Sequence, residues 1–275
     1  MIPAAFDYQR ADSIEHAIAL ITQAGDEAKF LAGGHSLLPL MKLRLAQPSL
    51  LIDITHITDA NTITETDTHL TIGALTRHHD IEHSPLLHQH APLLAHAAKH
   101  VGDPQVRHRG TIGGSIAHAD PASDLPATIL ALGATLTAQS TRGTRTINAT
   151  DFYTGFLETT LAPDELLTTI TIPKTTGAGW SFQKFNRRAQ DWAIVGVAAH
   201  HSPTQSGIAL INMGPTPILA TTVTNALRNG ATAKEAAQHA TDHTDATTDL
   251  NATTTYRNHL AKTLVERALL EAGIA

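Results

Sequence analysis

The sequence predicts an α+β fold with a larger N-terminal region and a smaller C-terminal one. Three observations support this prediction. A strand, a helix and a second strand follow one another near the start, strands and helices alternate through the middle, and short strands precede a run of helices at the end. The 275 residues, 42% of them hydrophobic, suffice for a sizeable core in one large domain or two to three small ones.

The first 57 residues are expected to form a small parallel unit in which a helix crosses between two strands. Asp12 and Glu15 resemble a capping box at the start of an amphipathic helix. Ser36 is expected to cap the crossover helix. The expected elements are a helix over 11–24, a strand over 28–32, a helix over 37–45 and a strand over 50–54.

The middle of the chain is expected to combine an antiparallel hairpin with helices and further strands. Thr76 is expected to cap the first of these helices, and Pro173 to end the last strand. The expected elements are strands over 62–64 and 69–73, helices over 76–82, 85–100 and 125–132, and strands over 134–138, 144–147 and 166–172.

Residues 175–179, with the sequence Thr-Thr-Gly-Ala-Gly, are the best candidate for a linker. We therefore expect one domain over 1–176, divided into subdomains 1–57 and 58–176, and a second domain over 177–275. The run 193–199 is apolar throughout, so its pattern does not distinguish a buried strand from a helix. The second domain is otherwise expected to hold strands over 180–185 and 207–213 and helices over 221–229, 232–240 and 253–272.

A glycine turn follows the strand expected over 28–32. Main-chain N–H groups at Gly33, Gly34, His35 and Ser36 would face a ligand there, with a helix N-terminus behind them, and such an arrangement binds anions. Neither the Gly-Lys-Ser/Thr of a P-loop nor the G-x-G-x-x-G dinucleotide pattern is present. The turn is therefore either a phosphate cradle or an ordinary strand-to-helix turn.

A second glycine turn lies about 80 residues later, over 109–115, and the chain is organised around it. Its glycines let the backbone come close to a ligand, its N–H groups are expected to form a second anion-binding concavity, and Ser115 adds a hydroxyl donor. Downstream, Asp124 would repel a phosphate but suits a sugar or polyol hydroxyl. The alternative is a tight turn before a helix in which Asp124 is only the N-cap. The functional interpretation is a phosphate-bearing ligand with a sugar or polyol, held mainly by main chain.

The amino-acid composition excludes several other classes of protein. The net charge of −6 provides no electrostatic footprint for nucleic acid. The absence of cysteine excludes disulfides, thiol catalysis and cysteine-ligated iron–sulfur clusters within this chain. Because no apolar run could span a membrane and the N-terminus does not resemble a signal peptide, a cytoplasmic protein is expected.

Histidine is abundant, with 18 residues, and seven of them lie between His78 and His100. His96 and His100 have the i, i+4 spacing of a helical metal site, but the pattern H-E-x-x-H is absent. Solvated helix faces are the favoured interpretation, and no metal site is expected.

Residues 32–39 and 109–115, with their order and spacing, together resemble one family: the FAD-binding medium subunits of molybdenum hydroxylases. The similarity is greatest to carbon monoxide dehydrogenase medium subunits and extends to the FAD domain of xanthine dehydrogenases. Residues 119–126 and 187–193 support it. The resemblance implies a two-part FAD-binding domain of the p-cresol methylhydroxylase/vanillyl-alcohol oxidase type, followed by a small C-terminal domain of an antiparallel sheet plus helices.

The resemblance also implies the cofactor-binding residues. The two turns would hold the FAD pyrophosphate, Asp124 a flavin-side hydroxyl, and Trp192 would lie beside the isoalloxazine ring, where relatives often have Tyr. Lys184 would contact the flavin, and no residue of this chain is expected to be catalytic. The full set is Leu31, Ala32, Gly33, Gly34, His35, Ser36, Leu37, Thr111, Gly113, Gly114, Ser115, Asp124, Ile172, Lys184 and Trp192.

By the same resemblance, the chain passes electrons through FAD from partner iron–sulfur clusters to an external acceptor. Its partners would be an iron–sulfur small subunit and a molybdenum-cofactor large subunit, assembled as a dimer of heterotrimers. One alternative is a stand-alone flavin oxidase or reductase of the same fold, like UDP-N-acetylenolpyruvoylglucosamine reductase. Another is a nucleotide-binding scaffold without enzymatic activity.

Overall fold

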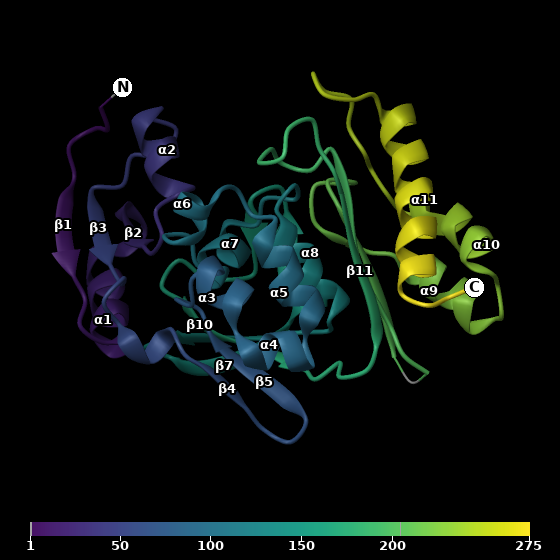
Figure 1. Cartoon of the computed structure of the whole chain (residues 1–275). Coiled ribbons are helices and arrows are strands. Elements are labelled where there is room, and N and C mark those ends of the chain that lie inside the picture. Colours follow the sequence, from purple (N-terminus) through teal and green to yellow (C-terminus); the bar gives the residue numbers. More distant parts are fainter. Residues whose placement is uncertain (1, 204) are drawn as a thin grey trace.

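Three sheets of three to five strands follow one another across the molecule in the computed structural model, which describes residues 2–203 and 205–275. In Figure 1 the small N-terminal sheet lies at one side, a helix-covered sheet occupies the centre, and the C-terminal sheet and its helices lie at the other side. Each sheet packs into a hydrophobic cluster of its own, and the central cluster also takes residues from the C-terminal sheet.

The N-terminal sheet is parallel throughout, in the order β1-β3-β2, which confirms the predicted parallel unit. Its core includes Ile18, Ile21 and Ile52. Strand β1 was not predicted, because all four of its residues are exposed and show no hydrophobic pattern. The elements are β1 (Asp7–Arg10), α1 (Ile14–Ala24), a 3₁₀ turn (Gly25–Glu27), β2 (Ala28–Leu31), α2 (Leu37–Lys42) and β3 (Leu50–Asp53).

Of the two cap predictions in this unit, one is wrong and the other is confirmed in position only. Helix α1 begins at Ile14, and Ser13 is its N-cap, with the hydroxyl accepting from the His16 N–H at 3.1 Å. The serine satisfies this donor, so Asp12 and Glu15 form no capping box. Ser36 stands at the N-cap of α2, but its side chain makes no capping hydrogen bond.

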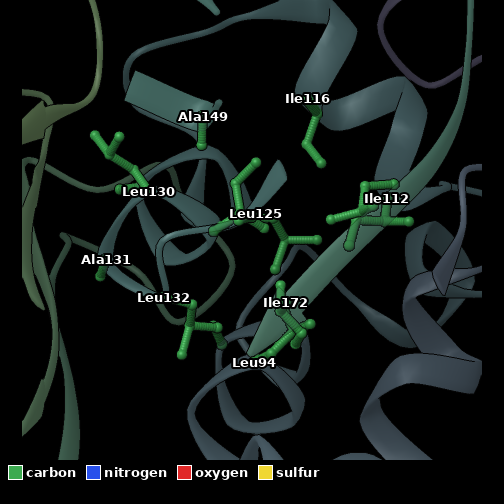
Figure 2. Packing of buried hydrophobic residues seen from close by; sticks show 14 of the residues in the cluster. Leu94, Ile112, Ile116, Leu125, Leu130, Ala131, Leu132, Ala149 and Ile172 are labelled. Carbon is green, nitrogen blue, oxygen red and sulfur yellow. The ribbon is translucent and has the colours of Figure 1, made fainter. Parts of the chain in front are cut away.

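The central sheet is antiparallel, in the order β4-β5-β10-β6-β7. Figure 2 shows Leu94, Ile112, Leu125 and Ile172 in its core. The strands are β4 (Ile63–Glu65), β5 (His69–Gly73), β6 (Thr135–Ser140), β7 (Gly143–Asn148) and β10 (Leu166–Pro173), with a hairpin of β8 (Tyr153–Gly155) and β9 (Glu158–Thr159) beside them. The helices are α3 (His78–His83), α4 (Pro85–His90), α5 (Pro92–Lys99), α6 (Pro104–Arg107), α7 (Ile112–His118) and α8 (Asp124–Ala131), with 3₁₀ turns at Thr58–Ala60 and Ala149–Asp151.

The long helix predicted over 85–100 is two helices, α4 and α5. Pro92 begins α5, and Ala91 before it has φ −151°, outside the helical region. Proline has no N–H to continue the helix and disfavours helical backbone in the residue before it. One further cap prediction is corrected, since Arg77 is the N-cap of α3 in place of Thr76. The alternative in which Asp124 is the N-cap of α8 is also wrong, because Ser123 holds that position and Asp124 is the first helical residue.

The C-terminal sheet is antiparallel, in the order β11-β12-β13-β14, and lies between two helical layers. Successive residues of β12 face opposite cores, since Ala198 belongs to the central cluster and Val197 and Ala199 to the C-terminal one. This two-sided burial explains why the run 193–199 lacked a strand pattern. The elements are β11 (Gly179–Phe185), β12 (Val195–His201), β13 (Ser206–Ile211), β14 (Ile218–Leu219), α9 (Thr221–Arg228), α10 (Ala233–Ala237), a 3₁₀ turn (Gln238–Thr241) and α11 (Thr254–Glu271).

Within residues 2–203 and 205–275, no helix combines the length and the apolar character that crossing a membrane requires.

Candidate functional site

A cavity of about 540 Å³ lies where the three sheets come together. Its wall includes Phe30 from β2, Ala74 after β5 and Lys184 from β11, so each sheet contributes. Thirteen of the predicted site residues line it, and they are Ala32, Gly33, Gly34, His35, Ser36, Leu37, Thr111, Gly113, Gly114, Ser115, Asp124, Lys184 and Trp192.

Leu31 and Ile172 do not line the cavity. Ile172 is fully buried in the central core, among the residues drawn in Figure 2. The Leu31 side chain lies 3.3 Å from the position that a Cβ on Gly34 would take, beneath the first turn. Leu31 therefore packs against the first turn, and Ile172 belongs to the central core.

The first turn presents unpaired donors to the cavity. The main-chain N–H groups of residues 33–37 donate to no acceptor among the described residues. Gly34 has φ +77°, a conformation that favours glycine and turns the chain back toward the start of α2. A run of free N–H groups in such a turn is a concavity suited to an anion.

The two glycine turns pack directly against each other. A Cβ on Gly33 would lie 2.4 Å from the carbonyl oxygen of Arg109 and 2.7 Å from Cα of Gly110. A Cβ on Gly113 would lie 2.5 Å from Cβ of Ala74. Glycine at these positions is therefore required by backbone packing, which brings together two segments about 75 residues apart in sequence.

The second turn differs from the first in how its donors are used. The N–H groups of Ile112, Gly113 and Ser115 donate to main-chain carbonyls, and that of Gly114 donates to the Thr111 hydroxyl at 3.2 Å. The prediction of free main-chain donors here is therefore wrong for residues 112–115. This turn instead offers a close backbone surface and the Ser115 hydroxyl, which lies 2.9 Å from the hydroxyl of Ser123.

A buried ion pair stands at another part of the wall. Nζ of Lys184 lies 2.7 Å from Oδ2 of Asp124, with the side chains 5% and 6% exposed, and donates also to the carbonyl of His100 at 3.0 Å. The other carboxylate oxygen of Asp124, Oδ1, is buried and has no partner. Burial raises the pKa of Asp124 to about 6, against the opposing effect of Lys184. An unsatisfied acceptor in a cavity wall suits a ligand that donates a hydrogen bond.

His78 also lines the cavity, although no motif in the sequence indicated it. It is the first residue of α3, and burial lowers its pKa to about 4. The ring is therefore uncharged near pH 7. A Cβ on Gly110 would lie 2.8 Å from its Nε2, and its Nδ1 has no partner. Apolar wall residues such as Val106 and Leu167 were also missed, since their residue types do not distinguish a cavity wall from a core.

Trp192 stands at the cavity on the loop between β11 and β12, with its side chain among the exposed hydrophobic groups at 58% exposure. On the same loop Arg188 pairs with Asp191 at 2.9 Å. Arg187 carries no ion pair among the described residues, and its side chain is exposed. The indole therefore closes part of the cavity while remaining accessible from solvent.

The family described as "FAD binding domain in molybdopterin dehydrogenase" matches residues 4–175, and "CO dehydrogenase flavoprotein C-terminal domain" matches residues 180–272. The chain belongs to this family of FAD-binding medium subunits. It is 41% identical to the carbon monoxide dehydrogenase medium chain of Hydrogenophaga pseudoflava, over 98% of this chain and 97% of that one. It is 35% identical to the nicotine 6-hydroxylase medium subunit of Paenarthrobacter nicotinovorans, over 98% of both.

Solved structures agree with this assignment. Carbon monoxide dehydrogenase from Hydrogenophaga pseudoflava superposes with a TM-score of 0.96 at 41% identity, over 99% of this chain and 98% of that one. Quinoline 2-oxidoreductase from Pseudomonas putida 86 gives 0.92 at 32% identity, over 99% and 98%. The medium subunit is thus an FAD-dependent oxidoreductase subunit, as the sequence resemblance predicted.

The residues of the cavity fit FAD. Free N–H groups at residues 33–37 suit its diphosphate, and the unpaired Oδ1 of Asp124 suits a hydroxyl of its sugar or ribityl chain. The apolar wall on β10 and near Val106 suits a flat ring system.

The affinity for FAD is expected to fall as the pH is lowered from about 8 to about 5. A hydroxyl that donates to Asp124 favours the ionised carboxylate, so its pKa in the complex lies below the value of about 6 in the free protein. Affinity is therefore complete above about pH 6 and is lost as the pH falls through that value. Fluorescence titration of apoprotein with FAD measures this, and Asp124→Asn should bind more weakly and with a flatter pH profile. An unchanged profile in the variant would contradict the assignment.

Proposed function

We propose that this medium subunit transfers electrons through FAD within a molybdenum hydroxylase complex of the carbon monoxide dehydrogenase type. The observation that carries the proposal is the cavity itself, where free N–H donors at residues 33–37 and the unpaired Oδ1 of Asp124 lie in one wall. FAD supplies the redox chemistry, taking up electrons and releasing them to an external acceptor. The residues of this chain bind it, orient it and control access to it.

The role that we propose for each residue follows from its position in the cavity wall. The turn of residues 33–37 holds the diphosphate, and Ser115 adds a hydroxyl donor at the second turn. Asp124 accepts from a cofactor hydroxyl, Lys184 keeps that carboxylate paired, and Trp192 lies beside the isoalloxazine ring. In this proposal residues 1–176, with subdomains 1–57 and 58–176, form an FAD domain of the p-cresol methylhydroxylase type, and 177–275 form the C-terminal domain.

The proposed partners follow from the cluster ligands that this chain lacks. The chain contains no cysteine, so a cysteine-ligated iron–sulfur cluster must come from another subunit. An iron–sulfur small subunit and a molybdenum-cofactor large subunit would fill these roles, in a dimer of heterotrimers in the cytoplasm. The names of the relatives, such as "medium chain" and "complex subunit alpha", support a multi-subunit assembly. The partner surface would lie near both glycine turns and residues 187–192, where the exposed Arg187 and Arg188 could pair with partner carboxylates.

Purification of the chain alone, and then with partner subunits, tests the proposal. A yellow protein that turns over no substrate until an iron–sulfur and a molybdenum subunit are added is the expected result. A yellow protein that oxidises or reduces a small organic substrate alone would support the stand-alone flavoenzyme instead. A protein that binds no flavin would support a scaffold.

FAD is expected to be bound without a covalent link. His35 lies in the first turn, at a place that resembles the attachment point of flavin in some relatives, but here it is proposed only to shape the turn. Acid precipitation should therefore release all the yellow colour into the supernatant. Colour retained in the pellet would show a covalent bond and refute this expectation.

Trp192→Ala is expected to keep FAD bound while making the reduced flavin react faster with oxygen. Because the indole is largely exposed at the cavity, its loss opens the cavity without removing core packing. Stopped-flow oxidation of the reduced protein measures the change. If the variant unfolds, Trp192 is a core residue. If it folds but loses flavin, Trp192 holds the cofactor, and either outcome would contradict the shielding role.

A further inference from the structure

We propose that helix α3 carries a site for a divalent transition-metal ion such as Zn²⁺, formed by His79, Glu82 and His83. One ligand atom from each of these side chains lies within 4.8 Å of the other two. The positions i, i+3 and i+4 place them on one face of the helix. Imidazole nitrogen and carboxylate oxygen form a ligand set that suits Zn²⁺, with water completing the coordination.

The imidazole of His83 is already in the form that a metal needs. Its Nδ1 lies 2.9 Å from the carbonyl oxygen of His79. A carbonyl only accepts hydrogen bonds, so Nδ1 carries the hydrogen and Nε2 of the neutral ring keeps its lone pair. In metal sites this kind of bond to a carbonyl fixes the tautomer and the orientation of a histidine ligand.

Glu82 and His79 are held in place by groups from α6 and the residue that follows it. Nε of Arg107 donates to Oε2 of Glu82 at 2.7 Å, which leaves Oε1 without a partner among the described residues. The ring of His79 stacks on that of His108, with centroids 4.0 Å apart, and its nitrogens make no hydrogen bond within the described part of the chain. Neighbouring groups therefore orient both side chains, and Oε1 of Glu82 and the nitrogens of His79 have no other partner among the described residues.

The pair that the sequence suggested, His96 and His100, is engaged differently. These rings pack at a tilt against aromatic groups of β11, with His96 and Trp180 centroids 5.1 Å apart and His100 and Phe182 centroids 5.4 Å apart. The pair thus belongs to the packing between α5 and the C-terminal sheet. His79 and His83 on α3 have the same i, i+4 spacing, and only there does a carboxylate, that of Glu82, converge with two histidines among the described residues.

The site lies beside the second glycine turn. α3 begins with His78 in the cavity wall, and Arg107 and His108 precede the turn at Gly110. The three ligands all belong to α3, and the inference does not depend on the proposed function. An ion that binds the folded protein in preference to the unfolded chain stabilises it. Zn²⁺ should raise the midpoint of thermal unfolding of the protein with FAD bound.

Metal binding to the full chain with its FAD, purified without a histidine tag and treated with a chelator, tests the inference. Competition with a chromophoric chelator should show one equivalent of Zn²⁺, and Co²⁺ should give a visible spectrum of an imidazole-containing site. His83→Gln and Glu82→Gln should each bind at least about tenfold more weakly. His239→Gln is the matched control, because His239 is also exposed and paired with a nearby carboxylate, that of Asp242 at 2.9 Å.

FAD content is measured in every variant, and it should not change, which separates this test from the proposed function. Circular dichroism shows whether Glu82→Gln still folds after losing its bond to Arg107. If it does not, the exposed His83→Gln decides the question. Absence of stoichiometric binding to the native protein, or equal affinity in His83→Gln and His239→Gln, would overturn the inference.

Discussion

Gly33→Val is expected to abolish FAD binding and to lower the yield of folded protein. The new Cβ would lie 2.4 Å from the Arg109 carbonyl oxygen and 2.7 Å from Cα of Gly110, and both are main-chain atoms that cannot rotate away. Separating the two turns would displace the free N–H groups of residues 33–37 from the rest of the cavity wall. Overpacking of this kind costs about 3 kcal/mol, and the overlap with backbone makes that a lower bound.

FAD content after gel filtration, together with urea unfolding, measures both effects. Gly114→Val separates binding from folding, because Gly114 is exposed and a Cβ there meets only the Thr111 hydroxyl oxygen, at 2.9 Å. We expect this variant to fold as apoprotein. Gly230→Ala is the distant control, since nothing lies within 4 Å of its Cβ position, although φ is +86° there. Full FAD occupancy in Gly114→Val would refute the close approach of the second turn to the cofactor.

Lys184→Met is expected to destabilise the protein by about 3–5 kcal/mol near pH 8, because it leaves the carboxylate of Asp124 buried without a counterion. Without the ammonium group the pKa of Asp124 rises above its value of about 6. The carboxyl group is then neutral in the folded variant at about pH 5, so the loss of stability relative to the native protein should be smaller there than at pH 8.

Urea unfolding at the two pH values measures these free energies. Lys174→Met is the matched control: Lys174 makes an equally short ion pair with Glu65, at 2.6 Å, but that carboxylate is 42% exposed. Such pairs contribute about 0–1 kcal/mol. The double variant Asp124→Asn/Lys184→Met should regain much of the stability and still bind FAD poorly. Equal losses for Lys184→Met and Lys174→Met would show that the buried pair has no special role.

Local patterns in the sequence predicted most of the elements and both glycine turns. Strands β2, β3 and β5 and helix α11 follow from hydrophobic periodicity, since that pattern depends only on neighbours along the chain. The composition of the turns was informative for a similar reason, because glycine, serine and threonine favour tight backbone near a helix start. The thirteen predicted residues that line one cavity were selected from those motifs and from the family resemblance.

Tertiary structure decided the rest. Asp124 and Lys184 are 60 residues apart, and no local pattern predicts that they share one buried ion pair. The donors of residues 112–115 are consumed in part by carbonyls of Ala74 and Thr76, whereas those of residues 33–37 remain free, although both turns are rich in glycine. Likewise, Ile172 was assigned to the cofactor but lies in the core. The run 193–199 did not show from its pattern that it contains a strand, because β12 is covered on both faces. Residue types determine which local conformations are available, but the packing of distant segments determines which polar groups remain unpaired, and those are the groups that can bind a ligand.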